Sequence, residues 1–408
     1  MTEPVTEAPA PERPAAAPPP PTLGTRLLLE LTGGPVLVAV LAVVTALIIG
    51  AVLIVFSDQG VLSKWGYFFA APGDALSASW HLVSATYAAL FRGALGSWSA
   101  LSETLTAATP LILTGLAVAL SFRAGLFNIG AEGQAIIGGL AAGYVGFSLH
   151  GLPVVVHLPL ALLAGLLGGA AWGFIPGALK ARTGAHEVIT TIMLNYVAAN
   201  LSLYLLSTAV FRRPGRTDPI SKPVEVPARL PHLAGQSLRV NAGLIVALLA
   251  TLLVAWLLRR STLGFELRVA GANPDAAQTA GISVGRATVL ALVIAGGLAG
   301  LAGAALILGV QFSLFPNFSS GIGFDAITLA LLGRAAPWGV VAAALLFGAL
   351  RAGGVEMQAA TGISVDLITV LQSLIVIFVA APALVRALYR LREARAGTGA
   401  PVSKGWGG

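Results

Sequence analysis

Polar side chains stand near the front of an otherwise apolar stretch, "GLFNIGAEGQAIIGGLAAGYVG" at 125–146, and they are the first candidates for chemistry. Its polar members include Asn128, Glu132 and Gln134. A carboxylate at the centre of a membrane-spanning helix costs roughly 2.5–3.5 kcal/mol on insertion scales, so it faces the interior of a bundle or a wet cavity. Asn128 and Glu132 are four residues apart and are expected on one helical face. They either hydrogen-bond to neighbouring helices or line the path of a solute.

The apolar stretch "HEVITTIMLNYVAANLSLYLL" at 186–206 contains a second polar set. Thr191 and Asn195 are four residues apart and are expected to share a helical face. Asn195 and Tyr196 together offer hydrogen-bond donors and acceptors to a hydroxyl-bearing or heterocyclic solute. Hydrogen bonds between helices explain the same residues equally well.

Two carboxylates open apolar runs in similar local sequence. The run at 129–132 reads IGAE and the run at 322–325 reads IGFD. With the topology given below, the two runs enter the membrane from opposite faces, as the halves of an inverted repeat do. Chance explains a match of this length equally well. The inverted repeat is therefore a hypothesis, and so is Asp325 as a residue of the solute path.

The polar loop "RRSTLGFELRVAGANPDAAQTAGISVGR" at 259–286 has the signature of a short capped helix. Asn273 is a good N-cap, Pro274 suits the first helical position, and Asp275 favours the positive end of the helix. Gly281 is a good residue for the position just after the helix. The sequence predicts a helix over about 274–280, outside the membrane, where a partner protein would grip it.

The sequence offers no site for hydrolytic or redox chemistry. No lysine follows a glycine, so there is no G-x-x-x-x-G-K-[ST] loop to cradle ATP phosphates. There is no cysteine, and the five histidines are scattered singly, without zinc-ligand spacing. The net charge of +7 comes from residues in loops between apolar spans, which favours membrane topology over nucleic-acid binding. We expect no metal, no cofactor and no nucleic acid.

The composition is too apolar for a soluble protein. Of the 408 residues, 56% are hydrophobic and 10% are charged, against about 25% charged residues in soluble domains. Long apolar runs recur along the chain, so we predict an all-α, polytopic transmembrane helical bundle of about ten spans. These predicted spans are 35–56, 105–121, 127–149, 157–179, 188–210, 242–258, 286–310, 323–333, 338–351 and 366–385.

Two tails flank this bundle. Residues 1–30 form a Pro/Ala-rich tail that is expected to be disordered, 31–390 form the transmembrane domain, and 391–408 form a second tail. Arginines directly after the last span, with an even number of spans, place both termini in the cytoplasm. The arginine-rich loop 211–241 then lies outside, which fits this rule poorly. The segment 57–104 is also expected outside, either as a helix along the membrane interface or as a packed loop.

Taken together, "LFNIGAEGQ", "HEVITTIMLNYVAANL", "GFELRVAGANPDAAQTAGI" and "GFDAITLALLGRAAPWGVVAAALLFGALRAGG" resemble the permease subunits of bacterial ABC importers. The group includes ribose-type sugar permeases and branched-chain amino acid permeases. The set is most similar to the nucleoside branch, which depends on a basic membrane lipoprotein, and the resemblance covers roughly 90–390. Arg334 departs from the family pattern, where a small or polar residue is expected after "ALLG".

The resemblance implies a division of labour between chains. A separate ATPase subunit uses ATP, a second related permease completes the pore as a heterodimer, and a lipid-anchored binding protein delivers the solute from outside. The segment 271–282 matches the family's coupling pattern, so the residues expected to dock on the ATPase are Gly271, Asn273, Pro274, Asp275 and Gly281. The residues expected along the solute path are Phe127, Asn128, Glu132, Gln134, Thr191, Asn195, Tyr196 and Asp325.

The resemblance therefore predicts a multi-pass permease of the bacterial plasma membrane, without enzymatic activity of its own, that moves a small polar solute such as a nucleoside. The ring faces of a nucleoside suit Phe127 and Tyr196, and its ribose hydroxyls suit the asparagines. Simple sugars such as ribose are the alternative solutes. A proton-coupled secondary transporter using Glu132 or Asp325, and a passive channel or scaffold, are the alternative functions.

Overall fold

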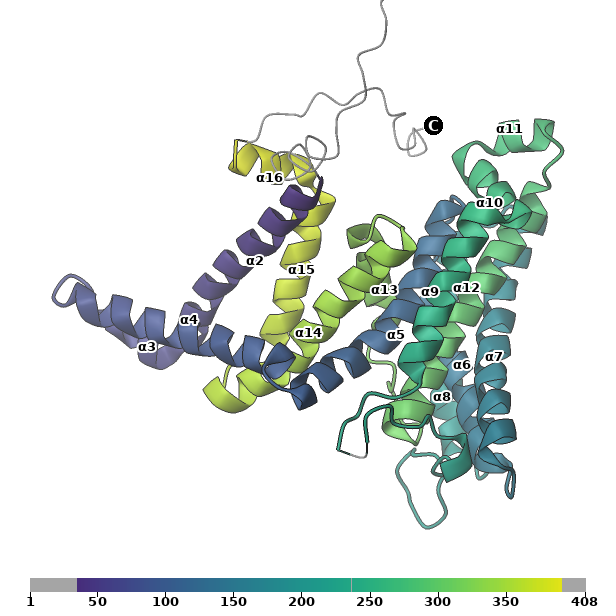
Figure 1. Ribbon diagram of the computed structural model, residues 1–408, viewed down its shortest axis with the longest axis horizontal. Helices are drawn as coiled ribbons and strands as arrows, with labels where there is room; N and C mark the ends of the chain where they lie inside the picture. Colours follow the sequence, from purple (N-terminus) through teal and green to yellow (C-terminus); the bar gives the residue numbers. More distant parts are fainter. Residues whose placement is uncertain (1–34, 236, 391–408) are drawn as a thin grey trace, which may run out of the picture.

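The computed structural model describes residues 35–235 and 237–390, and both predicted tails lie outside these residues. All regular elements in the described part are helices, with isolated β-bridges in the 208–242 loop. In chain order the helices in Figure 1 are α2 (Pro35–Ser57), α3 (Gln59–Trp65), α4 (Pro72–Leu95), α5 (Trp98–Arg123), α6 (Ala131–Ser148), α7 (Val154–Thr183), α8 (Glu187–Ser207), η1 (Val226–Ala228), α9 (Gly243–Arg260), α10 (Thr262–Ala272), α11 (Pro274–Thr279), α12 (Val284–Leu306), η2 (Ile307–Gln311), α13 (Ile322–Leu332), α14 (Pro337–Thr361), α15 (Asp366–Ala380) and α16 (Pro382–Leu388).

The predicted helical bundle is confirmed, and all ten predicted apolar segments are mostly helical. Seven helices of the described residues are long and apolar enough to cross a membrane: α2, α5, α7, α8, α9, α12 with η2, and α14. The helices α13 and α15 are apolar but shorter, and α6 has 18 residues with a polar front. The chain is a multi-pass membrane protein.

The segment 57–104 is mostly helical, so of its two predicted forms the helix is found and the packed loop is wrong, while its place outside the membrane stays a prediction. It forms α3, α4 and the first turns of α5, which begins at Trp98 rather than at 105. Ser97 caps α5 by accepting a hydrogen bond from Ala100 N–H (3.0 Å). Helix α4 lies across the direction of α7 and α12 in Figure 1. It packs on α14, where a Cβ on Gly353 would lie 2.2 Å from the Leu90 carbonyl oxygen.

Two predicted boundaries near the C-terminus are also wrong. Helix α14 runs for 25 residues, well past 351, because the polar residues that ended the predicted span continue the helix until Gly362, at φ 72°. The predicted span 366–385 is two helices, α15 and α16, separated at Ala381. Pro382 follows Ala381, and a proline disfavours helical backbone at the residue before it.

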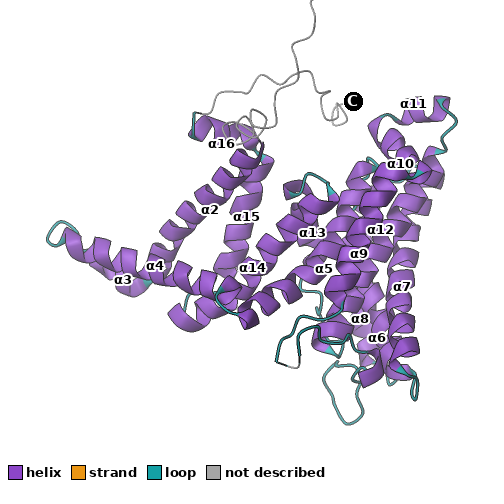
Figure 2. Cartoon of the chain, viewed as in Figure 1, coloured by secondary structure: helices purple, strands orange, loops and turns teal. Residues whose placement is uncertain are grey.

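The apolar side chains form two cores. The larger one joins α5, α6, α7, α12, α13 and α14, and the smaller one joins α2, α4, α14, α15 and α16. In Figure 1, α13 and α14 stand between the α2–α15 group and the bundle of α5 to α12. Figure 2 shows that the 208–242 loop lies at the end of the bundle opposite α11.

Helices α7 and α12 pack backbone against backbone. A Cβ added to Gly169 would lie 2.2 Å from the Gly296 carbonyl oxygen, and one added to Gly138 of α6 would lie 2.2 Å from Gly300 Cα. Small residues permit this approach between membrane helices, which have little hydrophobic force to drive them together. The α7–α12 pair therefore forms a tightly packed wall that holds α6 in place.

Candidate functional site

The polar stretch before α6 folds back on itself. Asn128 Oδ1 accepts from Gly130 N–H (2.9 Å), and Asn128 Nδ2 donates to Gln134 Oε1 (3.1 Å). Helix α6 begins only at Ala131, so Asn128 and Glu132 do not share a helical face, and that prediction is wrong. The side chain of Asn128 instead holds a turn, as asparagine commonly does. Asn128 and Gln134 are both buried, with exposed fractions of 0% and 1%.

Helix α8 ties itself to this turn through Asn195. Its Oδ1 accepts from Gly133 N–H (2.8 Å), and its Nδ2 donates to the Ile129 carbonyl (2.9 Å). Thr191 lies on the same buried face, as predicted, and is in contact with Gly130, where an added Cβ would lie 3.0 Å from Thr191 Cβ. Both residues therefore act as helix-to-helix contacts in this structure.

Glu132 joins α6 to α13. Its carboxylate accepts from Ser319 Oγ (2.5 Å), Gly321 N–H (3.2 Å) and Gly323 N–H (2.7 Å). Two of these donors are backbone groups at the start of α13, where a helix has unpaired N–H groups and a partial positive charge. Glu132 is only 6% exposed, so its carboxylate caps a short helix from the neighbouring segment.

Helices α6 and α13 run away from this junction in opposite directions. The far end of α6 meets the 208–242 loop, because Glu225 N–H donates to the Gly146 carbonyl (2.9 Å). The far end of α13 meets the end of α5, because Arg123 Nε donates to the Ala335 carbonyl (2.9 Å). Two helix N-termini thus meet at one carboxylate inside the bundle. The opposite directions fit an inverted repeat, but the repeat itself stays a prediction.

Asp325 has a different environment from Glu132. It forms an ion pair with Arg351 of α14, and both side chains are about a third exposed, at 28% and 31%. The two carboxylates of the IGAE and IGFD runs therefore make unlike contacts. Asp325 fastens α13 to α14, and Arg351 is a partner that the sequence pattern did not reveal.

Two aromatic residues of the predicted solute path stand at the edge of the junction. Phe127 is half-buried, and its ring stacks on Phe122 with centroids 5.2 Å apart. Tyr196 is 65% exposed on the outer face of α8. Of the predicted path residues, Tyr196 is the one whose side chain is mostly open in the described chain.

The predicted short helix in the 259–286 loop is confirmed as α11. Asn273 Oδ1 accepts from Asp275 N–H (3.1 Å) and Ala276 N–H (3.0 Å), and Pro274 is the first helical residue. After the helix, Gly281 has φ 80° and its N–H donates to Gln278, while Ile282 N–H donates to Ala277. This pair of bonds is the Schellman motif. Figure 1 shows α11 at one end of the bundle, beyond α10, and Ala277 is its buried residue.

A close backbone contact joins the α11 region to the polar junction. A Cβ on Gly271, at the end of α10, would lie 2.6 Å from Gly125 N, and Gly125 has φ 69°. Glu187 accepts a hydrogen bond from the backbone of Phe127 and pairs with Lys180 at 2.5 Å. The turn 124–128 is therefore held between α10 on one side and the start of α8 on the other.

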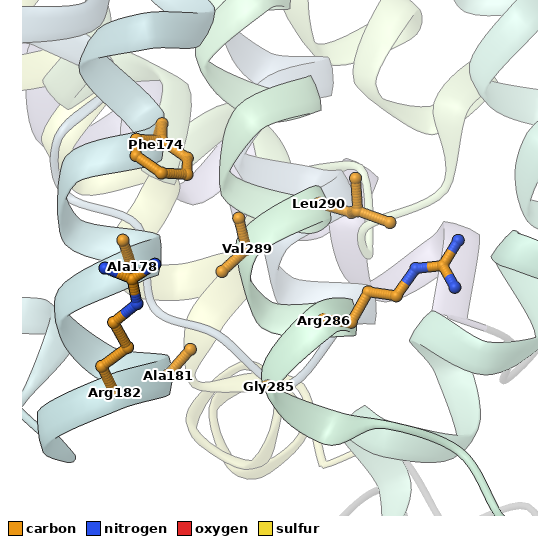
Figure 3. Close-up of a pocket in the computed structure, with 8 residues that line it drawn as sticks. All are labelled: Phe174, Ala178, Ala181, Arg182, Gly285, Arg286, Val289 and Leu290. Atoms are coloured by element: carbon orange, nitrogen blue, oxygen red, sulfur yellow. The ribbon is translucent and has the colours of Figure 1, made fainter.

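Other parts of the described chain offer less chemistry. A groove of about 370 Å³ lies between α7 and α12, with Phe174, Val289 and Leu290 along it and Arg182 and Arg286 near its α11 end (Figure 3). Its two guanidinium groups lie well apart in that view, and it does not touch the polar junction. No three His, Asp or Glu side chains of the described residues gather as metal ligands would.

Several partners in the junction were not found by sequence reasoning. Ser319, Gly321 and Gly323 bond to Glu132 although they lie nearly two hundred positions further along the chain. Glu187 and Gly125 stood inside the motifs quoted above. Their only signals were an acidic residue at the front of one apolar run and a glycine at the front of another, and neither signal names a partner.

Comparison with known proteins gives a consistent assignment. Residues 100–380 match the family described as the permease component of branched-chain amino acid transport systems. The chain is 40% identical over 309 residues to the guanosine ABC transporter permease NupP of Bacillus subtilis, covering 76% of this chain and 88% of the relative. It is 33% identical over 377 residues to the nucleoside ABC transporter permease NupB of Lactococcus lactis, covering 91% and 97%.

A third relative is named for another solute. A glucose ABC transporter permease of Haloferax volcanii is 39% identical over 301 residues, covering 72% of this chain and 79% of the relative. The chain also matches a second guanosine permease of Bacillus subtilis, NupQ, at 30% identity over 253 residues, 60% of this chain and 78% of the relative. No solved structure matches the chain.

Proposed function

This chain belongs to the family of permease components of branched-chain amino acid transport systems, and from that premise we propose that it moves nucleosides through an ATP-driven importer. The observation that carries the proposal is the 40% identity to a guanosine permease, extending over 88% of that relative. A second nucleoside permease matches nearly end to end. The chain is not itself an enzyme, and a separate ATPase subunit hydrolyses the ATP.

Glucose or another simple sugar is the second candidate solute. Its support is the glucose permease, whose 39% identity is close to that of the guanosine permease. The match to the glucose permease covers less of both chains than the match to the nucleoside permease of Lactococcus lactis does. Nucleosides and sugars both carry neutral hydroxyls, so either solute needs hydrogen-bonding groups rather than a charged pocket.

The structure supports a cytoplasmic position for the α11 end of the bundle. The described chain ends lie at that same end in Figure 1, and the basic residues of the last turns of α7 and α9 lie there too. Three arginines of the opposite loop have acceptors within the protein: Arg216 pairs with Asp218, Arg239 pairs with Glu103 of α5, and Arg229 donates to the Val224 carbonyl. Their number in an external loop is therefore consistent with this topology, in which both termini are cytoplasmic.

The proposed importer contains further subunits. Bacillus subtilis and Lactococcus lactis each have two different permeases that match this chain, which supports a second, related permease beside it. In this assembly α11 docks on the ATPase, with Asn273, Pro274, Asp275 and Gly281 shaping the docking helix. Gly271 carries its movement to the turn at Gly125. A lipid-anchored binding protein delivers the solute at the 208–242 end.

Reconstitution of the whole importer tests the proposal. The chain, its second permease, the ATPase and the binding protein are placed in vesicles with ATP inside, and uptake of labelled guanosine, uridine and glucose is measured. We expect saturable uptake of nucleosides that vanadate abolishes and a protonophore leaves intact. Uptake of glucose alone would favour the sugar alternative. Uptake that survives removal of ATP but not addition of the protonophore would show a secondary transporter.

A further inference from the structure

The backbone between α12 and α13 is irregular, although it joins two apolar helices. Helix α12 passes into the π-helix η2, and the segment 312–321 that follows has positive φ at Phe312, Asn317, Ser320 and Gly321. In the membrane, non-helical backbone is tolerated where it is buried in protein or lines a watery cavity. Part of this segment, 316–319, lines a pocket of about 210 Å³ against α6 and α8.

The pocket has unpaired hydrogen-bonding groups. Ser202 of α8 is 4% exposed, and its Oγ has no hydrogen-bond partner among the described residues. A hydroxyl buried without a partner costs about 1–3 kcal/mol, so native proteins rarely leave one. Asn200 donates from Nδ2 to the Tyr196 carbonyl (2.8 Å), which leaves its Oδ1 open within the described chain. The Asn317 side chain, at the pocket rim, has no hydrogen bond within the described chain.

The chemistry of the lining selects a neutral, hydroxylated ligand. None of its residues is ionisable: they are Ile136, Ala199, Asn200, Ser202, Leu203, Pro316, Asn317, Phe318 and Ser319. Glu132 lies behind this lining and is already bonded to Ser319. Phe318 is 1% exposed and its ring lies over Gly139, so it offers no open face for stacking a base.

We infer that this pocket, formed by α8 and the 316–319 turn, is a subsite for the ribose ring of the solute. Hydroxyl groups both donate and accept, which matches a serine hydroxyl, an amide oxygen and a free amide. The pocket is smaller than the 300–1,000 Å³ common for whole-ligand sites, so it takes the sugar part and leaves the base outside. Tyr196 and Phe324 are exposed, at 65% and 51%, on helices beside the pocket.

The position along α8 agrees with a site that receives solute from outside. Helix α8 begins beside Lys180 near the α11 end, and Ser202 lies about 22 Å further along at 1.5 Å per residue. It is therefore in the half of the membrane nearer the 208–242 loop. The inference rests on the proposed function, because it assigns the ribose of the proposed nucleoside to these residues.

The experiment compares ribonucleosides with their deoxy forms in the reconstituted importer. Guanosine and 2′,3′-dideoxyguanosine uptake are measured for the parent and for Ser202→Ala, Asn200→Ala and Asn317→Gly. The last variant keeps a residue that accepts positive φ. We expect each variant to lower guanosine uptake about 2- to 10-fold, the range for one lost hydrogen bond, and to leave dideoxyguanosine uptake unchanged. The binding protein is the same throughout, so a changed ratio reports the permease.

Two controls separate the pocket from general damage. Ser207→Ala removes a hydroxyl from the same helix, where it bonds to the Tyr204 carbonyl outside the pocket, and it should leave the ratio at the parent value. Ser202→Thr keeps the hydroxyl and should keep guanosine preference. If none of the three pocket variants changes the ratio, the subsite is wrong although nucleosides still move. If the parent importer moves no nucleoside at all, the proposed function fails first.

Discussion

Two polar regions of this membrane protein lie next to each other and differ in one respect. At the junction of α6, α8 and α13, the side chains of Asn128, Glu132 and Asn195 have protein hydrogen-bond partners. In the neighbouring pocket, the Ser202 hydroxyl is buried and has none in the described chain. A satisfied buried network rigidifies a fold, whereas a buried hydroxyl without a protein partner is where we propose that a ligand bonds. The polar residues that the sequence pattern singled out therefore hold the helices together. Ser202, which the pattern did not single out, lines the pocket.

The largest expected effect is the loss of Glu132. In Glu132→Ala, the N–H groups of part-buried Gly321 and buried Gly323 lose their acceptor, and each unsatisfied group costs about 1–3 kcal/mol. We expect destabilisation of roughly 2–6 kcal/mol, seen as a lowered melting temperature in detergent and poor assembly. Ser148→Ala, at the exposed end of α6, is the matched control. A Glu132→Ala importer that melts like the parent but accepts different solutes would move Glu132 from the junction to the solute path.

The next effect concerns Asn195. Asn195→Ala removes the bonds to Gly133 N–H and the Ile129 carbonyl, so we expect a stability loss of about 1–3 kcal/mol with an unchanged preference between guanosine and dideoxyguanosine. Thermal melting and the uptake ratio are measured on the same preparation. Ser207→Ala is the control, since it removes a polar group from the same helix outside both the junction and the pocket. If Asn195→Ala melts normally but changes the uptake ratio, Asn195 contacts the solute and the junction is not purely structural.

A third polar region, α11, sharpens the comparison because it should serve function without supporting the fold. Asp275 is exposed on α11. We expect Asp275→Arg to lower ATP-driven uptake tenfold or more, equivalent to about 1.4 kcal/mol, while melting changes little. ATP hydrolysis and uptake are measured on the same vesicles. The number of solute molecules taken up per ATP hydrolysed should fall. Asp218→Arg places the same change at the opposite end. Equal uptake in both variants would contradict docking at α11.

The smallest effect is expected at Gly281, just after α11. Alanine at φ 80° is strained, so Gly281→Ala should cost about 1 kcal/mol within a helix that packs little against the bundle. We expect uptake to fall severalfold and global melting to stay at the parent value. Gly215→Ala, at φ 78° in the opposite loop, carries the same strain away from α11. If both glycine variants lower uptake equally, backbone strain and not the position at α11 causes the effect.

The sequence predicted those parts of the fold whose signals depend only on neighbouring residues. Apolar runs of helical length depend on local composition, so all ten predicted segments are mostly helical. The caps of α11 are also local, and Asn273 and Gly281 occupy the expected positions. The errors come where local signals mislead. Helix α4 is too polar to be recognised as a membrane span from its hydropathy. In α14, Arg351 and Glu356 end the apolar run, but the helix continues.

The sequence predicted which residues form the candidate site, but it did not predict which groups they contact. The sequence identified Asn128, Glu132 and Asn195 because polar groups are costly in an apolar span. It predicted a shared helical face for Asn128 and Glu132, and this was wrong because Asn128 closes a turn before α6. The sequence did not identify Ser202, since a serine within a membrane helix normally donates its hydroxyl to a backbone carbonyl one turn earlier.

By itself the sequence determined that this chain is a membrane-embedded helical bundle with a short capped helix in a polar loop, because hydropathy and capping act over a few neighbouring residues. Only the tertiary structure decided which buried polar groups have hydrogen-bond partners and which have none. That outcome depends on donors brought from distant segments: Gly321 and Gly323 reach Glu132, while no described group reaches Ser202. Hydrogen bonds require a partner within about 3 Å, and the order of residues along the chain does not specify that distance.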